Sequence, residues 1–131
     1  MDEIDIKAPE FAGFFEAARQ GALAFPKCGS CRRFHWYPMK ACPHCRSRDI
    51  AWQKVEGTGT VFSWTAVRHA FDPAYKERLP YIVALLEFDD APGIRLVTNV
   101  EEVAPEAMRI GDRMRPRFHD SGKVTFHPAQ A

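Results

Sequence analysis

The sequence of 131 residues predicts a mainly β protein: an N-terminal helix, then a rubredoxin-like zinc ribbon, then a five-stranded OB-fold barrel. Two observations predict this order. Paired CxxC motifs occur within residues 28–45, and from Glu56 onward alternating β-branched and aromatic runs are separated by turn residues. We therefore expect a helical segment over residues 1–22, the ribbon over 23–54 and the barrel over 55–131.

The four cysteines pair as Cys28 with Cys31 and Cys42 with Cys45, with ten residues between the pairs. Each motif lets two thiolates converge from one tight turn, and two motifs supply the four sulfurs of a tetrahedral site that suits Zn²⁺. A four-thiolate site has no open coordination position, so its expected role is structural. Iron is the competing metal, because rubredoxin-type motifs have similar spacing.

Other features of the sequence favour zinc over iron, disulfides or a redox motif at these cysteines. Arg32 and Arg46 stand where rubredoxins usually carry small residues, which favours zinc over iron. The N-terminus is acidic and lacks the apolar core of a signal peptide, which argues against disulfides formed in an oxidising compartment. A redox CxxC motif normally begins a helix of a βαβ unit, and one such motif would suffice. We therefore expect a cytoplasmic, metal-binding protein.

A helix is expected over residues 9–20, because Pro9 suits its first turn and Gly21 suits the position just past its end. One apolar stripe runs along this helix, formed by Phe11, Phe14, Phe15 and Ala18. The stripe packs either on its own chain or on a partner chain, and the pattern alone leaves both open.

The barrel strands follow from alternation and turn residues. The first is expected over residues 57–69, with Phe62, Trp64 and Ala66 on one face and Val61, Thr65 and Val67 on the other. The other strands are expected over 81–88, 94–100, 113–119 and 123–127, with a loop over 70–80 and a helical turn over 105–108. Three strands, a short helix and two strands is the order of an OB-fold. The second strand is apolar on both faces, so the ribbon, the helix or a partner should cover it.

Charge and hydropathy exclude some function classes. No stretch approaches the ~20 apolar residues that a membrane span requires. The formal net charge is +1, and a bound zinc tetrathiolate would take it to about −1, which is not the balance of a non-specific nucleic-acid binder. Basic residues nevertheless concentrate in the ribbon: Lys27, Arg32, Arg33, Lys40, Arg46, Arg48 and Lys54. They either meet an anionic partner or are solvated charge around a negative metal complex.

Five features then occur in one order along the chain. They are a Phe-rich helix before Gly21, the paired CxxC motifs, the run Val-Glu-Gly-Thr-Gly-Thr-Val-Phe-Ser-Trp-Thr over 55–65, the run Pro-Tyr-Ile-Val-Ala-Leu-Leu-Glu over 80–87, and Ile-Gly-Asp over 110–112 before an Arg-rich strand. Together, from about residue 9 to 127, they resemble the family of acyl-CoA-associated proteins built from a rubredoxin-like zinc ribbon and an OB-fold. One departure is that this family commonly pairs an aromatic residue with Trp in the helix, where this chain has Phe14 and Phe15.

The resemblance implies a non-catalytic accessory subunit of an acyl-CoA-processing complex. Such a subunit docks on a thiolase-like enzyme, including lipid-transfer-protein-type thiolases, and helps to form its CoA-thioester channel. The partner then performs the thiolase, retro-aldolase or acyltransferase chemistry. A hotdog-fold enoyl-CoA hydratase is the alternative partner. Either way the resemblance implies a hetero-oligomer with structural Zn²⁺ and a CoA thioester as a ligand shared with the partner.

The loop between the first two barrel strands holds the candidate CoA contacts. CoA presents phosphates and an adenine, so its site should offer Lys or Arg and an aromatic face. This loop, a favoured binding loop of OB-folds, supplies Arg68, His69, Tyr75, Lys76 and Arg78. Each is alternatively a solvated loop residue. Every second residue from 113 to 117 is an arginine, so Arg113, Arg115 and Arg117 are expected on one face of their strand. Their guanidinium groups either bind phosphate, contact an acidic partner surface or are solvated.

Two other function classes compete with the accessory subunit. The first is a single-stranded nucleic-acid-binding OB-fold module, with Trp64, Tyr75 and Tyr81 as stacking platforms. The apolar second strand and the near-neutral charge argue against it. The second is an enzyme in its own right, but the five histidines are scattered, no serine has triad spacing, and all four cysteines are committed to the metal.

Overall fold

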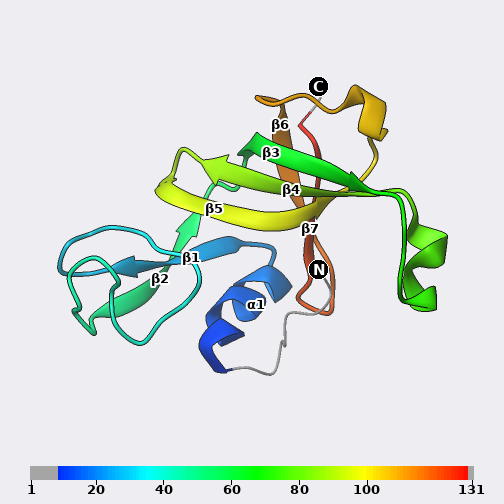
Figure 1. Cartoon of the computed structure of the whole chain (residues 1–131). Helices are drawn as coiled ribbons and strands as arrows, with labels where there is room; N and C mark the ends of the chain where they lie inside the picture. The colour runs from blue at the N-terminus through cyan, green and yellow to red at the C-terminus, as the bar shows by residue number, and fades with distance from the viewer. Residues whose placement is uncertain (1–8, 130–131) are drawn as a thin grey trace.

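The computed structural model describes residues 9–129, apart from the side chain of Tyr75, so the acidic stretch before Pro9 lies outside the described residues. The chain begins with a 3₁₀ turn η1 (Pro9–Phe11) that continues into helix α1 (Ala12–Arg19). Strands β1 (Leu23–Cys28) and β2 (Ile50–Val55) then form an antiparallel pair, with both CxxC motifs in the segment between and at their ends. Figure 1 shows this ribbon and helix on one side of a barrel.

The remaining strands close into a barrel in the order β3-β4-β5-β7-β6. Their bounds are β3 (Gly59–Val67), β4 (Tyr81–Phe88), β5 (Ala91–Val100), β6 (Arg113–Phe118) and β7 (Val124–Pro128), with 3₁₀ turns η2 (Pro73–Arg78) and η3 (Pro105–Ala107) between them. Neighbours pair antiparallel except β5 with β7, which meet in parallel. This confirms the expected mainly β fold with a five-stranded OB barrel.

Strand β3 contains a β-bulge between Val61 and Ser63. The side chains of this strand therefore do not alternate as the sequence predicts. The extra residue places Val61 inside the barrel, 1% exposed, together with Trp64 further along the strand. Phe62 points outward instead, 41% exposed, under the guanidinium of Arg95 at 3.8 Å. The expectation that Phe62 and Trp64 share a face is therefore wrong, because a bulge shifts the period-2 alternation by one residue.

The segment expected as a loop over 70–80 carries a short helix of its own, η2. The Asp72 carboxylate caps it by accepting a hydrogen bond from the backbone N–H of Ala74 at 3.0 Å, and Pro73 occupies its first turn. Figure 1 shows η2 projecting at the far end of β3 and β4 from the ribbon. We call residues 68–80 the η2 arm.

One hydrophobic core runs through helix, ribbon and barrel. Phe14 of α1 lies 6.3 Å from Phe25 of β1, Phe25 lies 5.3 Å from Phe88 of β4, and Phe88 lies 6.0 Å from Phe126 of β7 (ring centroids). Phe25 and Phe126 are both 0% exposed. The helix stripe thus packs on its own chain, which settles the alternative that the sequence leaves open. None of the helices that the structure describes is long and apolar enough to cross a membrane.

Strand β4 alternates between a buried and a partly covered face. Ile82, Ala84 and Leu86 point into the barrel, whereas Val83 and Leu85 are half-buried on its outer side. Helix α1 packs mainly on the two ribbon strands, so part of this outer face stays open to solvent.

Candidate metal centre and binding loop

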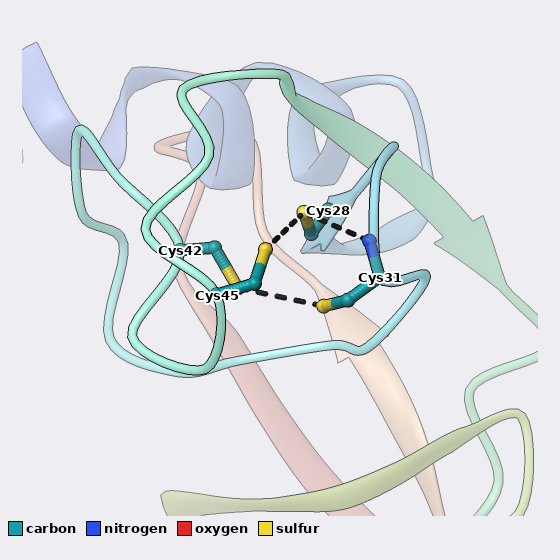
Figure 2. A group of neighbouring side chains, drawn as sticks. All are labelled: Cys28, Cys31, Cys42 and Cys45. Carbon is teal, nitrogen blue, oxygen red and sulfur yellow. Dashed lines mark hydrogen bonds between the residues drawn. The ribbon is translucent and has the colours of Figure 1, made fainter.

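The four cysteine sulfurs meet at one end of the ribbon, as Figure 2 shows. All four Sγ atoms lie within 4.8 Å of one another, with Cys28 and Cys45 3.5 Å apart and Cys31 and Cys42 3.6 Å apart. Zn–S bonds of about 2.3 Å in a tetrahedron place the sulfurs about 3.8 Å apart. The four thiols therefore fit a zinc tetrathiolate, in which Cys28, Cys31, Cys42 and Cys45 would be the ligands.

Backbone N–H groups point at the sulfurs of Cys28 and Cys42 and stabilise their thiolate forms. Cys28 Sγ accepts from the N–H of Ser30 at 3.3 Å and of Cys31 at 3.4 Å, and Cys42 Sγ accepts from the N–H of His44 at 3.3 Å. The N–H of Cys31, helped by that of Ser30, lowers the pKa of the Cys28 thiol to about 6. Cys28 is therefore prepared to bind a metal as a thiolate. At Cys45 the backbone N–H of Ser47 favours the thiolate, but the neighbouring Cys28 sulfur and burial outweigh it and raise the pKa to about 11, so a metal must displace that proton.

Each CxxC turn ends with an arginine in the left-handed region. Arg32 has φ 65° and Arg46 has φ 68°. Their backbone N–H groups donate to the carbonyls of Cys28 and Cys42 at 2.9 and 2.8 Å, so the two turns are built alike. A non-glycine residue in this region costs roughly 1–2 kcal/mol, which explains why such positions usually carry small residues.

Two histidines lie beside the metal site, and their environments differ. His44, inside the second motif, is exposed, and its Nε2 lies 3.3 Å from the carbonyl oxygen of Phe34. His35 is 4% exposed, and neither of its ring nitrogens has a hydrogen-bond partner. Burial, followed by the nearby His44, lowers the pKa of His35 below its ordinary value. His35 is therefore neutral at physiological pH.

The five candidate CoA contacts all lie on the η2 arm. Arg68 forms an ion pair with Glu106 at 3.3 Å, and the His69 ring meets the edge of Phe71 at 4.8 Å. Lys76 and Arg78 are exposed on η2. The side chain of Tyr75 lies outside the described part of the chain. The arm offers cations and an exposed aromatic, since Phe71 is 95% exposed.

A cavity of about 350 Å³ opens where the arm returns to the barrel. Its lining includes Arg78, Tyr81, Glu101, Glu102, Lys123 and Thr125. Sequence reasoning selected Arg78 but missed Lys123 and the two glutamates. They come from the end of β5 and the turn before β7, and only barrel closure brings these segments beside the arm.

Two of the three arginines in the row on β6 form ion pairs within the chain. Arg113 pairs with Asp89 at 3.7 Å, and Arg117 pairs with Glu101 at 3.5 Å and also with Glu102. Both arginines are therefore engaged by carboxylates of neighbouring segments, so the row is a weaker candidate for binding phosphate than its spacing suggests.

A partly buried polar chain joins β7 to the residue just after β5. Thr125 Oγ1 donates to Glu101 Oε1 at 2.8 Å, and His119 Nε2 lies 3.0 Å from the same hydroxyl. Because the hydroxyl hydrogen is used toward Glu101, Nε2 must be the donor in the second bond. His119 thus supports the fold here and is not placed to withdraw a proton from Thr125.

Two family models cover most of the chain. The model described as ChsH2, rubredoxin-like zinc ribbon domain, matches residues 15–51, and that described as ChsH2, C-terminal OB-fold domain, matches residues 52–119. The chain belongs to the ChsH2 family. The resemblance drawn from the sequence is thereby confirmed, and the four cysteines form the zinc-ribbon site of a ChsH2-family chain.

Solved structures extend the comparison over the whole chain. A chain of the "Ltp2-ChsH2(DUF35) aldolase" superposes with a TM-score of 0.82 at 32% identity, covering 96% of this chain and 99% of that one. A protein of unknown function from the DUF35 family of Sulfolobus solfataricus superposes with a TM-score of 0.69 at 19% identity, which is evidence for the fold alone.

Two curated relatives are larger than the region they share with this ChsH2-family chain. The "probable enoyl-CoA hydratase alpha subunit" of Thermomonospora curvata is 42% identical over 102 residues, which cover 76% of this chain and 30% of that protein. The "DUF35 domain-containing scaffold protein" of Pyrococcus furiosus is 31% identical over 85 residues, which cover 63% of this chain and 60% of that protein.

Proposed function

We propose that this chain is a non-catalytic accessory subunit of an acyl-CoA-processing complex. It docks on a thiolase-like enzyme, such as a thiolase, retro-aldolase or acyltransferase, in a hetero-oligomer. There it helps to form the channel that holds the CoA thioester. The observation that carries this proposal is the likeness of the whole chain to a subunit of the Ltp2-ChsH2(DUF35) aldolase, at 32% identity over nearly all of both chains.

The chain's own residues support a structural role for the metal and leave the chemistry to the partner. The four thiolates would complete the coordination of zinc, so the metal would hold the ribbon together and offer no position to a substrate. The polar chain at Thr125 is held by Glu101 and His119, which is a fold-supporting arrangement.

The η2 arm supports a shared CoA site. It carries Arg68, His69, Tyr75, Lys76 and Arg78, whose charges suit phosphates, and an exposed phenylalanine that suits an adenine face. The arm projects from the end of the barrel opposite the ribbon (Figure 1), so it is free to reach over the active-site entrance of a partner. CoA would then lie between two chains.

A hotdog-fold hydratase is the second candidate partner, because one relative is named an enoyl-CoA hydratase subunit. The nucleic-acid-binding alternative has less support. Trp64, one of its stacking platforms, packs partly buried against the hydrophobic core, so less of its ring is available to a base than on a solvent-facing platform.

A tagged form of the chain, purified from its native host with the retained proteins identified by mass spectrometry, tests the proposal. We expect a thiolase-like or hydratase subunit in fixed proportion. Retention of nucleic acid alone, lost as salt is raised, would overturn the accessory role and favour the nucleic-acid module. A tagged chain with Cys28→Ala is the matched control, because loss of one ligand should loosen the ribbon and release the enzyme.

A further inference from the structure

A pocket of about 480 Å³ opens on the ribbon, between the start of the N-terminal helix and the metal-bearing segment. Its lining is Pro9, Glu10, Pro26, Pro38, Met39, Lys40, Arg48, Ile50 and Trp52. Three proline rings and an indole make stiff apolar walls, so an incoming side chain meets a preformed surface. This pocket is separate from the cavity beside the η2 arm and shares no lining residue with it.

The surface beside the pocket exposes two large apolar side chains to solvent. Met39 is 53% exposed, and Tyr37, two residues before it, is 50% exposed. Tyr37 is held in place, because its ring lies 5.4 Å from that of Trp36 and 6.2 Å from that of Phe11. A fixed tyrosine and an adaptable methionine next to an apolar pocket are typical of a protein interface.

The cations around this pocket have no carboxylate partners. Among the described residues, none of the seven basic side chains of the ribbon takes part in an ion pair. By contrast, four arginines beyond the ribbon, Arg68, Arg95, Arg113 and Arg117, are each paired with Asp or Glu. A zinc tetrathiolate would carry a charge of about −2, and with Asp49 this offsets less than half of the ribbon's positive charge.

We propose that this ribbon face is the surface on which the partner enzyme seats an acidic segment. An apolar side chain of that segment enters the pocket beside Trp52, and flanking Asp or Glu residues meet Lys40 and Arg48. This deepens the proposed function and rests on it, since it assigns the docking face and the chemistry of the docked segment. A protein segment fits better than a nucleotide, because the exposed Tyr37 and Met39 extend the apolar surface beyond the pocket. Lys40 and Arg48 outnumber Glu10, the one acidic side chain of the lining, so the pocket still attracts an acidic segment.

The two cations of the pocket lining, Lys40 and Arg48, lie on either side of the second CxxC motif in the sequence. Lys40 precedes Cys42 by two residues and Arg48 follows Cys45 by three. The second CxxC turn therefore sets the distance between the two cations, which explains in physical terms why an accessory subunit would need a structural metal at its docking face.

The first test is zero-length carbodiimide coupling of the recovered complex, which joins a lysine amine to a carboxylate in contact with it. We expect Lys40 to couple to an Asp or Glu of the enzyme subunit. Coupling that runs only from Lys76 or Lys123 would overturn this docking face while leaving the accessory role intact. Failure to recover an acyl-CoA enzyme would instead count against the accessory role.

The second test decides the docking face independently of the partner's identity. A blocked acidic pentapeptide with a central phenylalanine is titrated into the zinc-loaded full chain, and the Trp52 indole signal is followed by NMR. We expect binding that weakens at least tenfold in Lys40→Glu and less than twofold in Lys54→Glu, an exposed ribbon lysine outside the pocket. Equal losses in both variants, no shift at Trp52, or a shift produced by CoA alone would overturn the proposal.

Discussion

At the scale of single residues, His35 links the ribbon's stability to pH. Its ring is buried without a hydrogen-bond partner, and burial lowers its pKa below the ordinary value of about 6.5. The unfolded chain therefore binds a proton more readily than the folded one. The neutral ring leaves stability intact above about pH 6.5, and stability is lost as pH falls below that value.

We accordingly expect His35→Leu to lose less stability than the wild type between pH 7.5 and pH 5.5. Denaturant unfolding of the zinc-loaded proteins at both pH values measures the difference. Acid also protonates the cysteine ligands in both proteins, so the comparison between variants isolates the histidine. An equal acid loss in the two proteins would contradict this account.

Also at this scale, Arg32 and Arg46 are strained, because their backbones adopt the left-handed conformation. Arg46 has φ 68°, and glycine adopts that conformation without the steric penalty. We expect Arg46→Gly to raise the free energy of unfolding by about 0.5–1 kcal/mol. Arg48→Gly is the matched control, an exposed arginine of the same segment without a positive φ, and it should be neutral or destabilising. Thermal unfolding of the zinc-loaded variants separates them, and a gain in both would disprove the strain.

At the scale of elements, helix α1 is joined to the ribbon by a close approach. A methyl group added at Gly13 would overlap the indole of Trp52. Gly to Ala in a helix normally stabilises by about 1 kcal/mol, but here we expect Gly13→Ala to destabilise by about 1–3 kcal/mol. Glu16→Ala, at an exposed position of the same helix, should change the free energy of unfolding by less than about 0.5 kcal/mol. Chemical denaturation of both variants checks this, and a stabilised Gly13→Ala would refute the contact.

At the scale of the whole molecule, the continuous core couples metal binding in the ribbon to the stability of the barrel. Phe25 belongs to β1, whose last residue is the ligand Cys28, and its ring lies 5.3 Å from Phe88 in the barrel. We expect zinc chelation to lower the unfolding temperature of the barrel, because a loosened β1 withdraws Phe25 from that contact. The NMR signal of Trp64, the tryptophan of the barrel, reports this without interference from the ribbon. If chelation leaves the unfolding transition at Trp64 unchanged, the ribbon and the barrel unfold as two independent units.

Much of the architecture could be predicted from local patterns. The spacing of Cys28, Cys31, Cys42 and Cys45 predicts the ribbon, and the apolar run over residues 81–88 matches the bounds of β4 in the structure. The β3 bulge was missed, because its position depends on register with β4 and the residues around it keep an ordinary alternation. Likewise η2 lies in a segment that the sequence predicts as a loop, because a short 3₁₀ turn that begins at a proline has no periodic pattern.

Local spacing along the chain was enough to predict four thiol ligands, the order of helix, ribbon and barrel, and the family. Which charged side chains are paired depends instead on contacts between distant segments. Ion pairs such as Arg117 with Glu101 join distant segments, so composition could not distinguish a neutralised arginine from the unpaired cations of the ribbon. The pocket at Trp52 was equally invisible in the sequence, because its walls come from the start of the helix, both ribbon strands and the segment between the CxxC motifs, and folding alone brings them together.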